Sequence, residues 1–167
     1  MYINEQIFKE LPPSLQGDIC KNMFENIIDK IEFLKGKPKN FIRKLFKLFK
    51  PIFLNAGDEL YHKGEISNEI YFVIQGRVVT KFNNNIGETK SLVLVEGSYF
   101  GEVDVIFKRE RAENAFSEDR CEIWKVFKDD FINLLDEFEN IKEEVVNSAV
   151  EKDKFMFQSN QEEEPQE

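Results

Sequence analysis

The chain has 167 residues, of which 41% are hydrophobic and 17 are phenylalanine, so it is long and apolar enough to form one domain with a full core. Its formal net charge of −9 argues against a general nucleic-acid-binding protein, which would present a basic surface. No apolar run approaches the length of a membrane-spanning helix, and the polar start of the sequence is unlike a secretory leader.

Residues 1–45 are predicted to form helices. A short amphipathic piece near 5–10 is followed by Pro12 and Pro13, and Ser14 is suited to cap the next helix. Apolar side chains then recur at helical spacing, and we expect them to pack in a core or against another subunit. The two stripes are Leu15, Ile19, Met23, Phe24, Ile27, Ile28 and Ile31, and then Phe41, Ile42, Leu45, Phe46 and Phe49.

The second stripe overlaps a basic run from Lys35 to Lys50 that contains no acidic residue. Its cations are Lys35, Lys37, Lys39, Arg43, Lys44, Lys47 and Lys50. One interpretation is the solvated face of a helix. The other is a surface that meets an acidic partner, another subunit or anionic lipid.

From Pro51 the pattern changes to short runs rich in Ile, Val, Phe and Tyr, separated by turn residues. Such spacing is typical of a β-sandwich or jelly roll. Strands are predicted near 50–54, 58–62, 69–75, 77–82, 88–94, 111–117 and 121–127, and another ends at Phe100. Helix returns at Lys128, a longer helix follows from about Glu139 to Phe157, and the polar tail 158–167 is predicted to be disordered.

The most specific signal is Phe100-Gly101-Glu102, which closes a strand and is followed by one helical turn and then by Arg111-Ala112. Amides at a helix start, one guanidinium and one carboxylate are the groups that a cyclic phosphodiester with a ribose hydroxyl needs. A glycine there lets the backbone turn sharply and approach the ligand.

This stretch resembles the phosphate-binding cassette of cyclic-nucleotide-binding domains. Three earlier landmarks occur in the family's order: Ala56–Glu59, Gly64-Glu65 and Ile70–Gly76. Residues 101–131 match, without a gap, the domain of hyperpolarisation-activated and cyclic-nucleotide-gated channels. The resemblance covers residues 46–157. It implies an α+β fold, in which an eight-stranded, jelly-roll-like β-roll carries a short cassette helix, N-terminal linker helices and C-terminal lid helices.

The resemblance also implies ligand contacts. Arg111 would hold the phosphate, Glu102 the ribose 2′-hydroxyl, and the amides of Glu102 to Asp104 would face the phosphate. Read from the residues alone, Arg111 is a surface arginine and Glu102 an exposed turn carboxylate. Members that prefer cGMP often carry threonine where this chain has Ala112, so cAMP is the expected ligand and cGMP the alternative. The full implied cassette is Phe100, Gly101, Glu102, Val103, Asp104, Arg111 and Ala112.

Two residues depart from the family pattern, because Asp104 and Glu113 stand where a small residue and alanine are expected. A carboxylate beside a phosphate repels it unless it turns away or is protonated. The departures leave three alternatives: either acid weakens binding, either acid pairs with Arg111 in the phosphate's place, or both face solvent.

The last helix corresponds to the family's lid, which closes over the base. Lys152, Phe155 and Met156 share one face of it at helical spacing, and the match places them near the nucleotide. The alternative is that they pack against the sheet.

Catalytic and metal-binding patterns are missing from the sequence. His62 is the one histidine, and Cys20 and Cys121 lie in separate elements, so neither a nucleophile–base arrangement nor a transition-metal site is expected. The cysteines suit a reducing compartment without a disulfide. We therefore expect a ligand-binding module and not an enzyme.

The segment before the β-roll resembles the end of the linker that joins an ion-channel pore to its nucleotide domain. This implies a cytoplasmic regulatory domain of a voltage-gated or cyclic-nucleotide-regulated cation channel, with potassium as the expected ion. Its partners would be the channel's transmembrane part and sister subunits, at the cytoplasmic face of a membrane. Two alternatives stay open: a homology domain that binds no nucleotide and serves in assembly, and a soluble cAMP receptor or kinase-regulating module.

Overall fold

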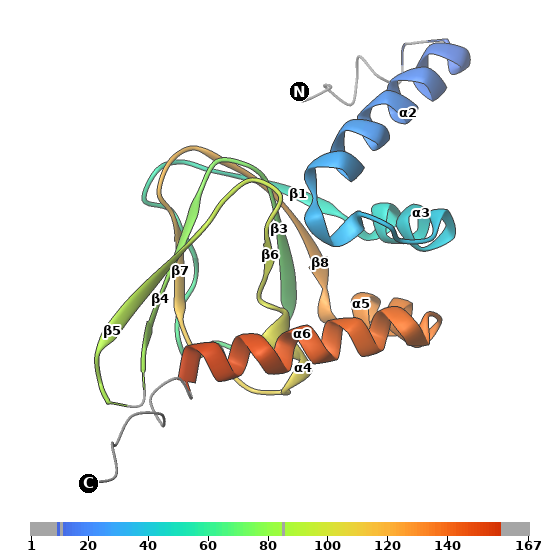
Figure 1. Cartoon of the computed structure of the whole chain (residues 1–167). Helices are drawn as coiled ribbons and strands as arrows, with labels where there is room; N and C mark the ends of the chain where they lie inside the picture. Colours follow the sequence, from blue (N-terminus) through green and yellow to red (C-terminus); the bar gives the residue numbers. More distant parts are fainter. Residues whose placement is uncertain (1–9, 11, 85, 158–167) are drawn as a thin grey trace, which may run out of the picture.

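The computed structural model describes residues 10, 12–84 and 86–157. Helices precede and follow a β-roll, so that α2 extends away from the roll while α6 runs along its opposite end beside α4 (Figure 1). The helical elements are α2 (Pro13–Lys30), the 3-10 turn η1 (Glu32–Leu34), α3 (Lys39–Leu48), α4 (Glu102–Ile106), α5 (Lys128–Asp136) and α6 (Glu139–Phe157).

In these residues, eight strands form two four-stranded antiparallel sheets, which confirms the predicted β-roll. One sheet has the order β1 (Lys50–Leu54), β8 (Cys121–Phe127), β3 (Glu69–Gln75) and β6 (Tyr99–Phe100). The other has the order β2 (Glu59–Tyr61), β7 (Asn114–Ser117), β4 (Val78–Asn83) and β5 (Thr89–Leu94).

Strand β3 is buried on both faces, which explains its continuous apolar sequence. Because side chains alternate along a strand, Tyr71 and Val73 enter the core inside the roll. Phe72 belongs to a second core, between this sheet and the helices.

The second core is rich in aromatic rings. The ring of Phe33 lies 6.0 Å from that of Phe41, 5.9 Å from that of Phe72 and 6.4 Å from that of Phe131, centroid to centroid. These rings come from η1, α3, β3 and α5, and burying each contributes about 2–3 kcal/mol. The predicted stripe at Phe41, Ile42 and Leu45 is thus core, and it fixes α3 against the C-terminal helices.

The predicted strand 111–117 begins three residues later than expected, at Asn114. Arg111 instead bonds the turn before β3: its amide donates to the carbonyl of Glu65, and its carbonyl accepts from the amide of Gly64, both at 2.8 Å. The two main-chain groups of Arg111 are therefore committed to this turn and not to the sheet.

Part of the basic run pairs within the chain. Lys37 Nζ lies 2.7 Å from the carboxylate of Glu144 on α6, and Lys44 pairs with Glu137 at the end of α5. These ion pairs join α3 to the C-terminal helices. The predicted helical piece near 5–10 and the predicted disordered tail lie outside the described residues, apart from Glu10. Within the described part of the chain, no helix is both long and apolar enough to span a bilayer.

Candidate functional site

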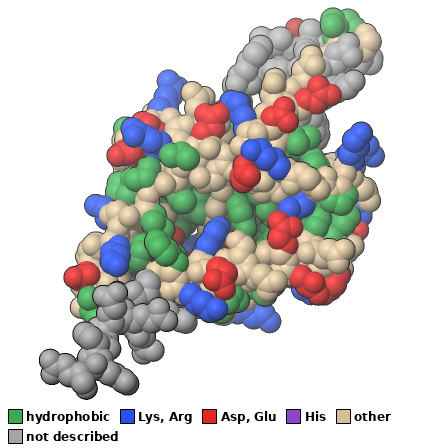
Figure 2. All heavy atoms as spheres, viewed as in Figure 1, with side chains coloured by type: hydrophobic (Ala, Val, Ile, Leu, Met, Phe, Trp, Pro, Cys, Tyr) green, Lys and Arg blue, Asp and Glu red, His purple; other side chains and the backbone are tan. Residues whose placement is uncertain are grey.

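A cavity of about 340 Å³ lies between the β-roll and α6, large enough for a small organic ligand. On this face of the molecule, Figure 2 shows a hollow with apolar side chains in it and charged side chains around it. The cavity is lined by Thr80, Leu92, Leu94, Tyr99, Phe100, Gly101, Glu102, Val103, Asp104, Arg109, Glu113, Ser148, Glu151, Lys152, Phe155 and Met156.

The turn from β6 into α4 depends on Gly101. Its φ of +83° lies in the left-handed region, which is strained for a residue with a Cβ. A Cβ at this position would come within 3.1 Å of both Arg111 Nη1 and the Tyr71 ring. Glycine therefore lets the backbone turn, starts α4 at Glu102 and leaves the first amides of that helix without intrahelical partners.

Arg111 lies behind this turn, with 3% of its surface exposed. Its guanidinium donates to the carbonyl of Gly101 at 2.8 Å and to that of Glu69 at 2.5 Å, and it stacks on the Tyr61 ring at 4.4 Å. Among the described residues, neither Arg111 nor Ala112 belongs to the lining of the cavity. Two neutral carbonyl acceptors thus fix the guanidinium beside the cavity.

Asp104 is buried between two arginines. One carboxylate oxygen accepts from Arg109 Nε at 2.8 Å, and the other lies 3.9 Å from Arg111 Nη1 and accepts a long hydrogen bond from the Ala112 amide. Of the three sequence alternatives, solvent exposure is wrong for Asp104 because the side chain lies in the cavity wall. The negative charge of Asp104 therefore partly compensates the positive charge of Arg111.

Glu113 is also buried in the cavity wall, so solvent exposure is wrong for it too. One carboxylate oxygen accepts from the Tyr61 hydroxyl at 3.1 Å, while the other is buried and has no hydrogen-bond partner among the described residues. Burial, with Asp104 and Glu102 nearby, raises the pKa of Glu113 to about 7 against the opposing effect of the Thr80 and Tyr61 hydroxyls. The group therefore titrates near neutrality.

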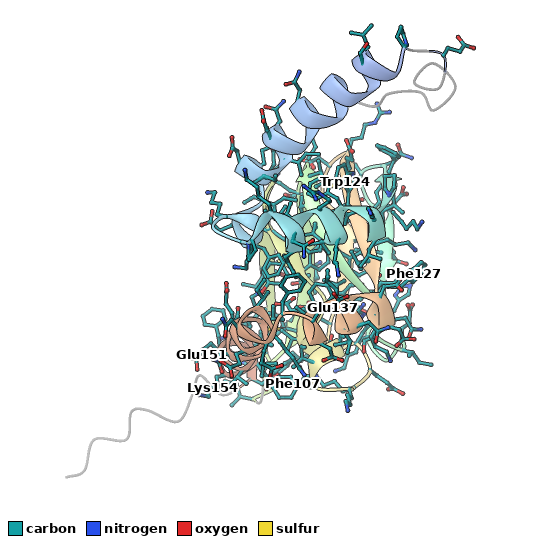
Figure 3. The ribbon with its side chains drawn as sticks, turned by 90° about the vertical axis from the view of Figure 1, so that its right-hand side faces the viewer. Phe107, Trp124, Phe127, Glu137, Glu151 and Lys154 are labelled. Atoms are coloured by element: carbon teal, nitrogen blue, oxygen red, sulfur yellow. The ribbon has the colours of Figure 1, made fainter. Side chains whose placement is uncertain are left out.

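Two adjacent residues of α6 pair with the cassette. Lys152 Nζ bonds the buried carboxylate of Glu102 and lies 4.1 Å above the Tyr99 ring. Asp153 lies 2.7 Å from Arg109 Nη2. Figure 3 labels Glu151 and Lys154 on the same end of α6. These contacts hold α6 against α4 and the loop after it.

The structure brings most of the predicted site residues to one cavity, Lys152, Phe155 and Met156 included. Arg111 and Ala112 adjoin it. Sequence reasoning missed Arg109 and Asp153. The sequence does show a second arginine, Arg109, two residues before Arg111. Its ion pair with Asp153 of α6 depends on tertiary contacts that the sequence pattern does not reveal. In the described residues, no three His, Cys, Asp or Glu side chains are grouped to hold a metal ion.

The chain is similar to known proteins in both sequence and fold. The family model for the cyclic nucleotide-binding domain matches residues 51–138. Among curated proteins, the chain is 26% identical over 144 residues to the cyclic nucleotide-gated channel cone photoreceptor subunit alpha of Gallus gallus, covering 83% of this chain and 19% of that protein. It is 26% identical over 139 residues to the potassium voltage-gated channel unc-103 of Caenorhabditis elegans, covering 82% and 16%. The chain thus spans about a fifth of the length of these relatives.

Two solved structures share the fold. The regulatory domain of Toxoplasma gondii PKA, in a co-crystal structure with cAMP, aligns with a TM-score of 0.68 and 19% identity, covering 78% of this chain and 50% of that one. The catabolite activator protein of Thermus thermophilus aligns with a TM-score of 0.63 and 18% identity, covering 72% and 57%.

Proposed function

The chain belongs to the cyclic nucleotide-binding domain family, and we propose that it binds cAMP in preference to cGMP and regulates a cation channel. One observation carries the proposal: Gly101, Glu102 and the buried Arg111 surround the start of α4, next to an apolar cavity that α6 closes. These groups supply what a cyclic phosphodiester, a ribose and a base each require.

Each part of the ligand has matching groups in the cavity wall or beside it. The first amides of α4 and the Arg111 guanidinium would take the phosphate, and the Glu102 carboxylate would take the ribose 2′-hydroxyl. Phe155 and Met156 would cover the base. Lys152 must give up its bond to Glu102, or share it, when the ribose binds.

The preference for cAMP rests on Ala112. An alanine side chain cannot donate or accept a hydrogen bond, so it offers nothing to the exocyclic amino group of guanine. The more polar guanine also loses more on desolvation in a mostly apolar cavity.

The channel assignment rests on the relatives, which are named as a cyclic nucleotide-gated and a voltage-gated potassium channel. In this proposal, α2 and α3 connect the β-roll to a transmembrane part and to sister subunits at the cytoplasmic face of a membrane. Ligand binding shifts the position of α6 and the helices that pack with it, and it biases gating by its differential affinity for two states. Hydrophobic membrane spans encoded upstream would distinguish this from a soluble cAMP receptor or kinase-regulating module.

A second candidate is a homology domain that binds no nucleotide and serves in assembly. It is favoured by the way Arg111 is already satisfied by two carbonyls and accompanied by Asp104. Calorimetric titration of the purified chain with cAMP and cGMP decides between the two. We expect heat from cAMP and weaker binding of cGMP. No heat and no thermal stabilisation at millimolar cAMP would favour the assembly role.

A further inference from the structure

We propose that Glu113 is a ligand-contacting residue that carries a proton in the complex and donates it to an oxygen of the bound phosphodiester, so that the site takes up one proton with its ligand. The inference rests on the proposed function, that this cavity binds a cyclic nucleotide. It replaces the interpretation of Glu113 as a residue that only blocks the site.

The geometry leaves one oxygen of Glu113 in need of a partner. The side chain lines the cavity together with Gly101 and Asp104, next to the start of α4. Its first oxygen is occupied by the Tyr61 hydroxyl. Its second is buried and makes no hydrogen bond of normal geometry in the described residues, although the Thr80 hydroxyl also faces the carboxylate. Buried polar atoms are rarely left unsatisfied, and a proton shared with a phosphate oxygen would satisfy this one.

The charges around Glu113 favour its protonated form. Glu102 and Asp104 face it from α4, and the neutral hydroxyls of Tyr61 and Thr80 face it from β2 and β4. Each nearby cation already has a partner: Arg109 is paired with Asp104 and Asp153, and Lys152 with Glu102. Arg111 stacks on Tyr61 and points its donors at the carbonyls of Gly101 and Glu69.

Binding would therefore depend on pH in one direction. Burial raises the pKa of Glu113 to about 7 in the free chain, and an anion beside it raises that pKa further. Below pH 7 the acid is already protonated and affinity is constant. Above it, each bound ligand must recruit a proton from solvent, and affinity falls about tenfold per pH unit. The ligand itself keeps its single negative charge throughout.

The test is calorimetry of the full chain with cAMP at about pH 6 and about pH 8.5, on either side of that pKa, in two buffers of different ionisation enthalpy. We expect affinity to fall at least tenfold at the higher pH and the buffer dependence to give uptake of nearly one proton there. Glu113→Gln keeps the shape and a donor, so it should bind equally at both pH values without proton uptake. Glu110→Gln, an exposed neighbour in the same loop, should keep the pH dependence.

Tyr61→Phe gives a second variant in case Glu113→Gln does not fold. It removes the hydroxyl that stabilises the ionised carboxylate, so the fall in affinity should move to higher pH. Equal cAMP affinity at both pH values, without proton uptake by the wild type, would overturn the inference while leaving the proposed function intact. No heat from wild type, Glu113→Gln or Tyr61→Phe at either pH would overturn both.

Discussion

Lys152 of α6 pairs with Glu102 of α4, a carboxylate that is 1% exposed and has no second ion-pair partner among the described residues. The pair holds α6 against α4. It also occupies the carboxylate that a ribose hydroxyl would need. The same contact therefore stabilises the fold and, in the proposed function, would compete with the ligand.

Replacing Lys152 with alanine should destabilise the chain by about 1–3 kcal/mol, because it leaves Glu102 buried without its counter-charge. The value is below that of a fully buried pair because the Lys152 side chain is 39% exposed and water can replace part of the interaction. Urea unfolding measures the loss. Lys154→Ala on the same helix removes a pair that is exposed on both sides and should change stability by less than about 0.5 kcal/mol.

A Lys152→Ala, Glu102→Gln double variant completes the cycle. It should recover part of the stability, because no buried charge is left unpaired. Additive losses in the double variant would show that the two side chains do not stabilise one another.

Arg111→Ala should weaken cAMP binding by about 2–5 kcal/mol, the usual cost of losing one charge-assisted partner of a buried anion. It should also cost about 1–3 kcal/mol of stability, because the carbonyls of Gly101 and Glu69 lose their donor. Calorimetry and urea unfolding separate the two effects. Arg77→Ala, at an exposed arginine that does not line the cavity, is the control. Unchanged cAMP affinity in Arg111→Ala would contradict the phosphate assignment.

Much of this fold follows from the sequence. The run Ile70–Ile74 is apolar because both faces of β3 are buried, and the strand bounds of β1 and β8 agree with their patterns. Sequence patterns did not predict the structure where the main chain of a residue forms hydrogen bonds with a different segment of the chain. Arg111 looks like the start of a strand, yet its main chain bonds the turn at Gly64 and Glu65.

In the site, too, local features were predicted from the sequence and tertiary contacts were not. The motif at Phe100-Gly101-Glu102 predicted a turn and a short helix, because glycine and strand ends are local properties. The burial of Asp104 and Glu113, and their partners Arg109 and Tyr61, could not be predicted. They depend on how the cassette, β2 and α6 pack together, which periodicity does not encode.

Without ligand, Glu113 should make stability fall as pH rises. Its pKa is near 4.5 when unfolded and about 7 when folded, so the folded chain binds more protons between these values. The stabilisation is present in full below about pH 4.5, is lost as the pH rises to about 7, and amounts to about 3–4 kcal/mol. Glu113→Gln should remove this decline and be more stable than wild type at pH 8. Parallel stability curves for the two proteins between pH 5 and pH 8 would contradict the assignment.

Gly101→Ala should both destabilise the chain and weaken cAMP binding. The left-handed φ alone costs about 1–2 kcal/mol for alanine, and the new Cβ would press on Arg111 and Tyr71. Gly57→Ala is a matched control, because its φ of +86° is similar and nothing lies within 4 Å of the added Cβ. The difference in unfolding free energy between the two variants gives the cost of the contacts between the new Cβ and its neighbours. Gly57→Ala should keep wild-type affinity for cAMP.

Asp104→Asn should tighten cAMP binding. The asparagine can still accept from Arg109 Nε, but it no longer supplies the negative charge that now lies 3.9 Å from Arg111 Nη1. The ligand phosphate then becomes the main counter-charge for that arginine. Repulsion between Asp104 and the phosphate is removed as well, so both effects act in the same direction. We expect a gain of at least about 1 kcal/mol at low ionic strength, since charges a few ångströms apart interact strongly in a partly dry site.

The gain should shrink as salt is added, to the extent that the site is open to ions. Calorimetry with cAMP in low and high salt measures it, with Asp129→Asn on the exposed surface of α5 as the control. Combining Asp104→Asn with Glu113→Gln should give less than the sum of their effects above pH 7, because both acids act on one phosphate. Weaker binding in Asp104→Asn would mean that Asp104 positions Arg109 for the ligand and that its charge does not oppose the phosphate.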